Sequence, residues 1–305
     1  MPLHAAGLSR RTFLAQGAAA IAGITVLRNG WGAESGMNPN RMVLLSDTHI
    51  PSTPDVTAHN TNMTSNLRQV VKEILALETK PAAVLINGDC AYLKGLPADY
   101  ANLANCVAPL SEARLPLHMT MGNHDDRGPF YDALKAQKPE RPLLASKHLT
   151  LIESPMANWY LLDSLTQVNV VTGEIGVEQR AWLDQALGER PHKPALVVAH
   201  HTPQFDAPVA GQPWGGIKDT TEFIDLLARH PHVKAFIFGH SHNWSVTKRG
   251  ALQLINLPPV AYLFAAGKPN GWVLAETSEK GLSLELKTID PQHKQNGERV
   301  ELAWQ

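Results

Sequence analysis

The sequence predicts an α/β fold in which two mixed β-sheets pack face to face, with helices on the outside. In the first half, apolar strand segments alternate with helical segments, a pattern typical of parallel strands joined by crossover helices. In the second half, several strand segments follow one another with short turns between them, which indicates antiparallel pairing. We find no internal repeat and no linker, so we expect one domain over residues 37–305.

The first half is predicted from apolar periodicity. Its elements are a strand at 41–46, a helix at 60–80, a strand at 82–87, a helix at 97–114, a strand at 116–121 and a short helix at 128–138. The helix at 60–80 has Leu67, Val70 and Ile74 at helical spacing, and Pro97 suits the first turn of the next helix. The run at 82–87 is almost wholly apolar, as expected of a strand that is buried on both faces.

The second half is predicted by the same reasoning, with shorter spacing between strands. Its elements are strands at 148–153 and 159–163, an amphipathic helix at 177–188, a strand at 195–199, a helix at 220–230, a strand at 233–238, and four short antiparallel strands at 244–247, 252–256, 271–276 and 282–288.

Composition excludes several classes of protein. The 305 residues carry a formal net charge of −1 and no basic run, so we expect no nucleic-acid polymer as a partner. The two cysteines, Cys90 and Cys106, form neither a disulfide framework nor a Cys-x-x-Cys metal motif.

The N-terminus resembles a twin-arginine export signal. Ser9-Arg10-Arg11-Thr12-Phe13-Leu14 precedes a mildly apolar stretch rich in alanine and glycine, and small residues follow near 30–36. The alternatives are the start of a basic amphipathic helix and a membrane anchor, although the apolar run is short for a spanning helix. We assign residues 1–36 to the signal, which implies the twin-arginine machinery as a partner and a periplasmic or extracellular location.

Five predicted strands end in side chains that bind metals. In chain order these are Asp47 and His49, Asp89, Asn123 with His124, His200, and His240 with His242. Ligands gather outside the carboxyl ends of strands in α/β sheets. Residues two apart in an extended backbone also point the same way, so Asp47 and His49 should reach one point. Carboxylates and neutral imidazoles suit Mn, Fe or Zn, so the sequence predicts a metal site.

These segments resemble a known family. Asp47-x-His49, Gly88-Asp89, Gly122-Asn123-His124-Asp125, His200 and Gly239-His240-x-His242 are similar, in order and spacing, to the signature blocks of calcineurin-like metallophosphoesterases. The resemblance extends over essentially all of the chain after the signal. It implies a four-layer α/β/β/α sandwich of two mixed β-sheets with a dinuclear metal site at the carboxyl ends of the strands.

The resemblance also implies roles for the residues. One metal would be held by Asp47, His49, Asp89 and His242, and the second by Asp89, Asn123, His200 and His240, with Asp89 bridging. The ions would be two divalent or mixed-valence metals, Mn, Fe or Zn. A hydroxide between them would be the nucleophile, and His124 would act as general acid or stabiliser of the leaving group.

Several assignments stay open at this point. His200 is preferred over the adjacent His201 because it follows the apolar strand directly. Tyr92 matches the Gly-Asp-x-x-Tyr spacing of purple acid phosphatases, where tyrosine binds ferric iron, but His49 departs from that pattern, so Tyr92 is assigned near the metals or in the pocket. Asp125 would orient His124, or else Asp125 and Asp126 would cap a helix.

Two tryptophans are candidates for the substrate pocket. Trp214 lies in a loop rich in glycine, and Trp244 follows His242. Each would stack on a base or aryl group, or else serve in packing.

The likeness to class III cyclic-nucleotide phosphodiesterases and glycerophosphodiesterases, carried by Gly122–Arg127 with Asp47-x-His49, implies a phosphodiesterase acting on small soluble diesters. The alternative is a phosphomonoesterase like the purple acid phosphatases. A non-catalytic, metal-stabilised binding protein is a third hypothesis from another class, which the presence of His124 and all ligands disfavours.

Overall fold

The computed structural model describes residues 36–304, so the export signal expected at 1–36 lies outside them except for its last residue. The first sheet has the strand order β14-β13-β12-β1-β4-β5 and the second has the order β10-β11-β9-β8-β7-β6. No helix within residues 36–304 is long and apolar enough to cross a membrane.

The first sheet is mixed. Its strands are β1 (Met37–Ser46), β4 (Lys80–Asn87), β5 (Leu117–Thr120), β12 (Gly271–Thr277), β13 (Gly281–Thr288) and β14 (Arg299–Ala303). The strands β1, β4 and β5 are parallel neighbours, whereas β12 joins β1 in the antiparallel sense. Three parallel strands therefore direct their carboxyl ends to one edge of this sheet.

The second sheet is mixed as well. Its strands are β6 (Thr150–Glu153), β7 (Asn158–Leu161), β8 (Ala195–Val198), β9 (Val233–Phe238), β10 (Ser245–Arg249) and β11 (Leu252–Asn256). The strands β7, β8, β9 and β11 run parallel, and β6 and β10 are antiparallel edges. The strand at 252–256 was expected to pair only in the antiparallel sense, but its partner β9 is parallel.

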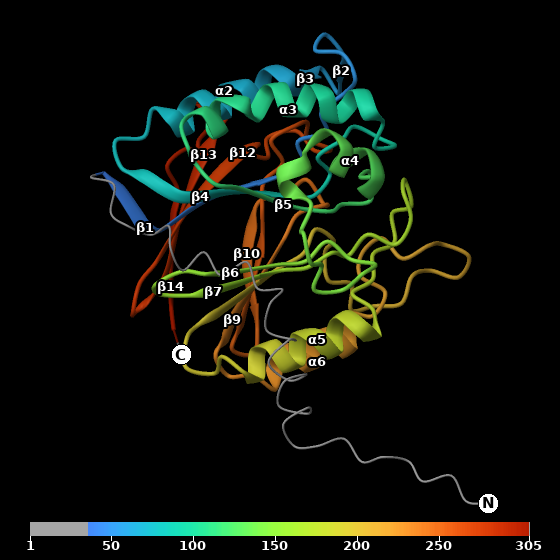
Figure 1. Ribbon diagram of the computed structural model, residues 1–305, viewed down its shortest axis with the longest axis vertical. Helices are drawn as coiled ribbons and strands as arrows, with labels where there is room; N and C mark the ends of the chain where they lie inside the picture. The colour runs from blue at the N-terminus through green and yellow to red at the C-terminus, as the bar shows by residue number, and fades with distance from the viewer. Residues whose placement is uncertain (1–35, 305) are drawn as a thin grey trace, which may run out of the picture.

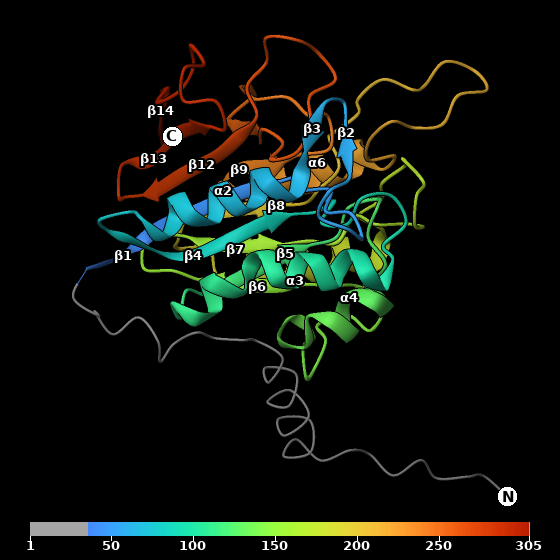
Figure 2. The same ribbon diagram turned by 90° about the horizontal axis from the view of Figure 1, so that it is seen from above.

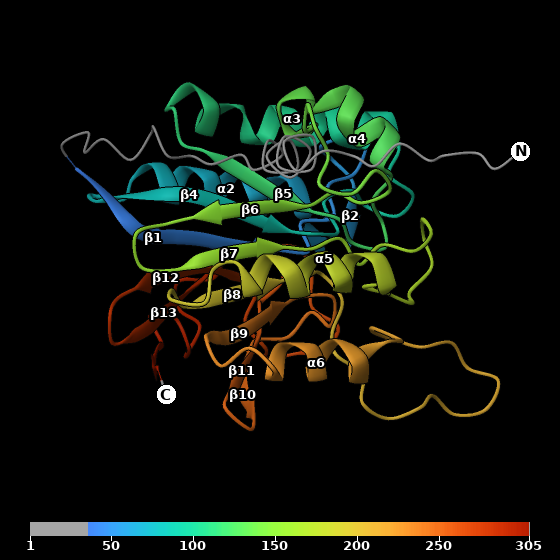
Figure 3. The same cartoon turned by 60° about the horizontal axis from the view of Figure 1, so that its bottom comes forward.

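Helices cover the outer face of each sheet, so the molecule has four layers (Figure 1). The helices α2 (Met63–Leu75) and α3 (Pro97–Glu112) lie side by side over the first sheet, with α4 (Arg127–Ala133) and the 3-10 turn η1 (Lys135–Gln137) at one side (Figure 2). The helices α5 (Val177–Gly188) and α6 (Thr220–Ala228) cover the second sheet (Figure 3). The prediction of an α/β fold with mixed sheets is confirmed.

Three apolar clusters hold these layers together. One lies between α2, α3 and the first sheet, and includes Leu67 and Val84. The second fills the space between the sheets, and includes Leu44 from the first sheet and Trp159 and Ile237 from the second. The third packs α5 and α6 on the second sheet. Burial on both faces explains why the central strands are apolar throughout.

Two segments differ from the prediction. The helix expected from residue 60 begins at Met63, because Asn62 caps it and residues 57–62 form a hairpin of β2 (Thr57–Ala58) and β3 (Thr61–Asn62). The strand β14 was not predicted, because its alternation of charged and apolar residues is short and it lies at a sheet edge.

Candidate metal centre

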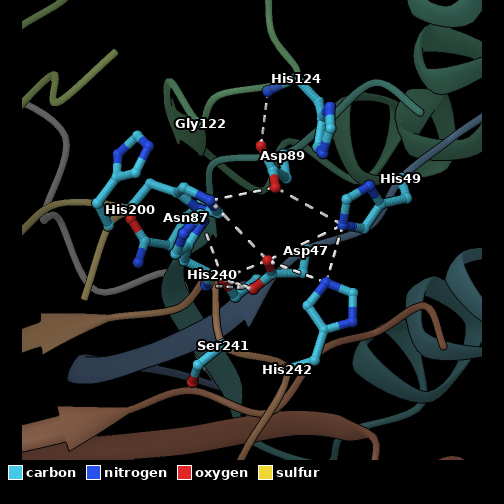
Figure 4. A network of polar contacts seen from close by, with 12 residues as sticks. Asp47, His49, Asn87, Asp89, Gly122, His124, His200, His240, Ser241 and His242 are labelled. Carbon is cyan, nitrogen blue, oxygen red and sulfur yellow. Dashed lines mark hydrogen bonds and ion pairs between the residues drawn. The ribbon is translucent and has the colours of Figure 1, made fainter. Parts of the chain in front are cut away.

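The polar strand ends of both sheets converge in one cluster. The loops after β1, β4 and β5 supply Asp47, His49, Asp89, Asn123 and His124, and those after β8 and β9 supply His200, His240 and His242. The side chains face one another across a small space at the junction of the two sheets (Figure 4). Most of them are almost fully buried.

The two carboxylates occupy the middle of the cluster. Oδ2 of Asp89 lies 3.2 Å from Nε2 of His200 and 3.7 Å from Nε2 of His49. Oδ1 of Asp47 lies 3.4 Å from Nε2 of His242 and 4.0 Å from Nε2 of His49. Three groups have ligand atoms within 4.8 Å of one another: Asp47 with His49 and His242, Asp89 with His200 and His240, and His49 with Asp89 and His124.

Four of the imidazoles are oriented by backbone carbonyls. The pairs are His49 Nδ1 with Tyr92 O at 3.2 Å, His200 Nδ1 with Asn87 O at 2.9 Å, His242 Nδ1 with Tyr262 O at 2.7 Å, and His240 Nε2 with Gly215 O at 2.9 Å. A carbonyl oxygen only accepts, so each ring donates through that nitrogen and keeps a lone pair on the other. Metal-binding histidines are held in this way by their outer partners.

These residues fit a pair of bound cations. Within residues 36–304, Nε2 of His200 and Oδ1 of Asn123 are buried without a hydrogen-bond partner. The Nε2 atoms of His49 and His242 face each other at 3.0 Å, although both rings are oriented to present lone pairs there. Such a concentration of unpaired acceptors is unfavourable in a buried site without a cation. Carboxylate, amide and imidazole together suit Mn, Fe or Zn.

The protonation states favour cation binding. Burial would raise the pKa of Asp47, but His200 and His242 lower it to about 2, and the pKa of Asp89 is held well below its usual range. Burial chiefly lowers the pKa of His49 and of His240 to about 4. At neutral pH both carboxylates are therefore charged and these two imidazoles are neutral ligands.

Among the described residues, five of the nine non-glycine positions with positive φ belong to the cluster. They are Asp47 (φ 52°), His49 (44°), Asp89 (47°), His240 (70°) and His242 (50°). From their spacing, Asp47 and His49 were expected to converge because alternate residues of an extended strand point the same way. They converge instead through left-handed turns after β1. Such conformations are costly for histidine and are concentrated at functional sites.

His124 lies at the edge of the cluster. Its Nδ1 is 2.8 Å from the carbonyl of Leu93, and its backbone NH donates to Oδ1 of Asp89 at 2.9 Å. Its ring centroid is 5.3 Å from that of His49. Nε2 is therefore the nitrogen free to face a substrate or an ion.

Asp125 supports two ligand loops and does not itself cap α4. Its buried carboxylate accepts from the backbone NH groups of Cys90, Ala91 and Gly122, and from the hydroxyl of Tyr100. It thereby joins the loop that carries Asp89 to the loop that carries Asn123. The helix cap is the next residue, Asp126, whose side chain accepts from the NH of Gly128.

The side chains of the two adjacent histidines after β8 have different partners. His200 points to Asp89, whereas Nδ1 of His201 lies 2.7 Å from the hydroxyl of Ser164. His201 is also fully buried, and its ring centroid is 4.7 Å from that of His240. Its Nε2 has no hydrogen-bond partner within residues 36–304, and His201 belongs to none of the three groups.

The remaining pocket candidates take different places. Tyr92 contributes its carbonyl to His49, and its half-buried side chain packs on the first apolar cluster. Trp214 is half-buried in the loop whose Gly215 contacts His240. Trp244 takes the packing alternative, because it is buried in the apolar cluster between the sheets.

The sequence analysis missed three aromatic side chains beside the cluster: His59, Tyr262 and Phe264. The ring centroid of Tyr262 lies 5.1 Å from that of His49, and Phe264 stacks on His242 at 4.3 Å. The only signal for them in the sequence is the pair of aromatic residues at 262 and 264, in a loop between predicted strands.

Comparison with known proteins gives one consistent result. Residues 41–244 match the family described as calcineurin-like phosphoesterase. A probable cyclic nucleotide phosphodiesterase from Synechococcus is 29% identical over 67% of this chain and 75% of its own length. A glycerophosphodiester phosphodiesterase from Enterobacter lignolyticus is 25% identical over 72% of this chain and 76% of its own length.

A solved structure has the same fold. A dimetal phosphatase from Danio rerio aligns with a TM-score of 0.66 at 16% identity, over 87% of this chain and 99% of that protein.

Proposed function

The chain belongs to the calcineurin-like phosphoesterase family, and we propose that it is a metal-dependent phosphodiesterase for small soluble diesters. Membership makes it a phosphoric ester hydrolase. The observation that most strongly supports catalytic activity is the cluster itself. In it, two ionised carboxylates lie beside imidazole rings that backbone carbonyls orient, so that the other ring nitrogen faces the site. A binding protein that had lost turnover would not need to keep this arrangement complete.

The proposed ligands divide into two sets. Asp47, His49, Asp89 and His242 would hold one cation, and Asp89, Asn123, His200 and His240 the other. Asp89 belongs to two of the observed groups, as a bridging carboxylate would. Two bound cations would supply an activated water and neutralise the phosphate oxygens, chemistry that side chains alone lack.

His124 is proposed as the proton donor. Its Nδ1 is engaged with the carbonyl of Leu93, so the ring can pass a proton only through Nε2. The ring flanks Asp89, close to where a phosphate would lie. Protonating the leaving oxygen there would assist cleavage of an unactivated alkyl ester.

The choice of a diester rests on the named relatives, which are phosphodiesterases for cyclic nucleotides and glycerophosphodiesters. The alternative is a phosphomonoesterase like the purple acid phosphatases, favoured by the spacing of Tyr92 from Asp89. His49 opposes this alternative, because it occupies the cluster and is oriented by the carbonyl of Tyr92.

We further propose export by the twin-arginine route to the periplasm or beyond, where the enzyme would release phosphate from external esters. The supporting feature is the segment Ser9–Leu14. Cell fractionation of the full chain beside an Arg10→Lys, Arg11→Lys double variant tests this, and an unchanged distribution would refute it.

The enzymatic proposal is tested with the purified protein loaded with Mn, Zn or Fe, while bound metal is counted in the same samples. Turnover of bis(p-nitrophenyl) phosphate is compared with that of p-nitrophenyl phosphate. We expect two metals per chain, a preference for the diester and loss of activity on chelation. A preference for the monoester with a coloured iron form would instead support the acid-phosphatase alternative.

A further inference from the structure

Three aromatic side chains form a rim on one side of the metal cluster. We call His59, Tyr262 and Phe264 the aromatic rim. Phe264 stacks on His242 with centroids 4.3 Å apart and an angle of 25° between the rings. His59 stacks on Tyr262 at 4.6 Å and meets Phe264 edge-on at 5.7 Å. The three rings thus form one continuous surface next to two proposed metal ligands.

This surface is open to solvent. Phe264 is 63% exposed, while Tyr262 beneath it is only 6% exposed, and His59 is exposed. Single exposed apolar residues are common on proteins. Phe264 differs because its ring stacks on the proposed ligand His242 and meets a second exposed ring, that of His59, edge-on. A substrate held at the cluster would find an aromatic face within reach.

The backbone holds the rim in place. The NH groups of Val260 and Ala261 donate to the carbonyls of Ser46 and Asp47, at 2.9 and 3.1 Å. The carbonyl of Tyr262 accepts from His242 at 2.7 Å. The loop that carries Tyr262 and Phe264 is therefore anchored directly to the segments that carry the proposed ligands.

A strained turn presents His59. His59 and Asn60 form the two-residue turn between β2 and β3, with φ of 48° and 61°. Glycine and asparagine are the residues most typical of such a turn, and positive φ is uncommon for other residues even though histidine adopts it more often than most. A costly conformation that places a ring at a site rim is typical of a functional constraint.

We propose that the aromatic rim binds a planar ring of the substrate, such as a nucleobase, by stacking on Phe264 while the phosphate lies at the cluster. The inference rests on the proposed function and narrows it to diesters of the nucleotide type. Stacking of a base on an aromatic side chain would strengthen binding by roughly 5-fold to 150-fold. A glycerol ester has no ring and would gain nothing from the rim.

The test compares two ligands that differ only in the base, AMP and ribose 5-phosphate. Binding to the metal-loaded protein is measured by calorimetry, and inhibition of diester turnover is measured in parallel. We expect AMP to bind at least about 5-fold more tightly. Phe264→Leu should remove this difference by weakening AMP alone, and Phe264→Trp should keep it. Val177→Ala, at an exposed apolar position on α5, serves as the control.

The inference is overturned if neither ligand binds, if the native protein does not distinguish them, or if Phe264→Leu weakens both equally. Failure of the proposed function has a different signature, which is the absence of diester turnover. Calorimetry measures the base preference without turnover, so it tests the inference independently. A higher kcat/KM for glycerophosphodiesters than for cyclic AMP, unchanged by Phe264→Leu, would also refute the inference.

Discussion

The two sheets contribute different chemistry to the metal cluster. The loops that follow β1 and β4 of the first sheet bring both carboxylates, Asp47 and Asp89. The loops that follow β8 and β9 of the second sheet bring only imidazoles, from His200, His240 and His242. A carboxylate attracts a cation at a distance, whereas a neutral imidazole binds only in contact. The first sheet should therefore decide whether ions are retained, and the second should complete their coordination.

The loops are also held differently. In the first sheet, the carboxylate of Asp125 joins the loops of Asp89 and Asn123 through backbone NH groups. Backbone bonds join the loops of both sheets: the NH of His49 donates to the carbonyl of Asp89, and the NH of Gly239 to that of His200, both at 2.9 Å. The carboxylate of Asp125 is an additional support that belongs to the first sheet. The loops of the first sheet, which carry both carboxylates, are thus joined to each other by Asp125. Variants in the two sheets should therefore differ in their effect on metal binding and turnover.

The largest effect is expected from Asp89→Ala. This change removes the proposed bridging charge, so activity should be abolished and at least one metal should be lost. Bound metal by atomic absorption and turnover on the same sample give the answer. Asp126→Ala, which removes a helix cap on the adjacent loop, should keep both metals. Retention of two metals by Asp89→Ala would show that the first sheet does not control ion binding.

A smaller loss should follow His124→Ala, which removes a first-sheet residue that is proposed to act without holding metal. Turnover should fall roughly 10²–10⁴-fold with metal content near normal. The structure also groups His124 with His49 and Asp89, so a loss of both metals would make it a ligand.

The second sheet is tested with His200→Ala and its neighbour His201→Ala. Loss of the proposed ligand His200 should weaken binding of one metal by more than the roughly 10–100-fold typical of residues that only orient a ligand, and loss of His201 should weaken it by no more than that. Metal titration by calorimetry measures both. The reverse order would make His201 the ligand.

The smallest effect concerns a histidine of β5 outside the cluster. Burial lowers the pKa of His118 to about 4. Between pH 6.5 and 4, His118 binds a proton in the unfolded chain but not in the folded protein. Its contribution to the free energy of unfolding is therefore complete above pH 6.5 and is lost as pH falls toward 4. The slope is at most about 1.4 kcal/mol per pH unit.

His118→Leu should therefore flatten the decline in the free energy of unfolding between pH 6.5 and 4, measured by urea titration of the metal-free protein. His192→Leu, at an exposed position, is the matched control. If both variants decline as steeply as the native protein, burial of His118 does not control this window.

Most of the fold, and the positions of the residues in the cluster, can be predicted from local sequence. Apolar runs such as 82–87 specify buried strands, and the polar residues that end them must lie at a sheet edge. Contacts between distant segments carry the rest. Nothing near Asp125 in the sequence indicates that it accepts from Cys90 and Ala91, and nothing at Tyr262 indicates its contact with His242.

The left-handed backbone at Asp47, His49, Asp89, His240 and His242 has an evolutionary consequence. Each costs about 1–2 kcal/mol relative to a residue without a side-chain clash. Exchange of any of these residues for glycine would relieve that cost while removing a proposed metal ligand. A descendant no longer selected for hydrolysis could therefore gain stability by losing its site, and inactive relatives would be easy for this fold to produce.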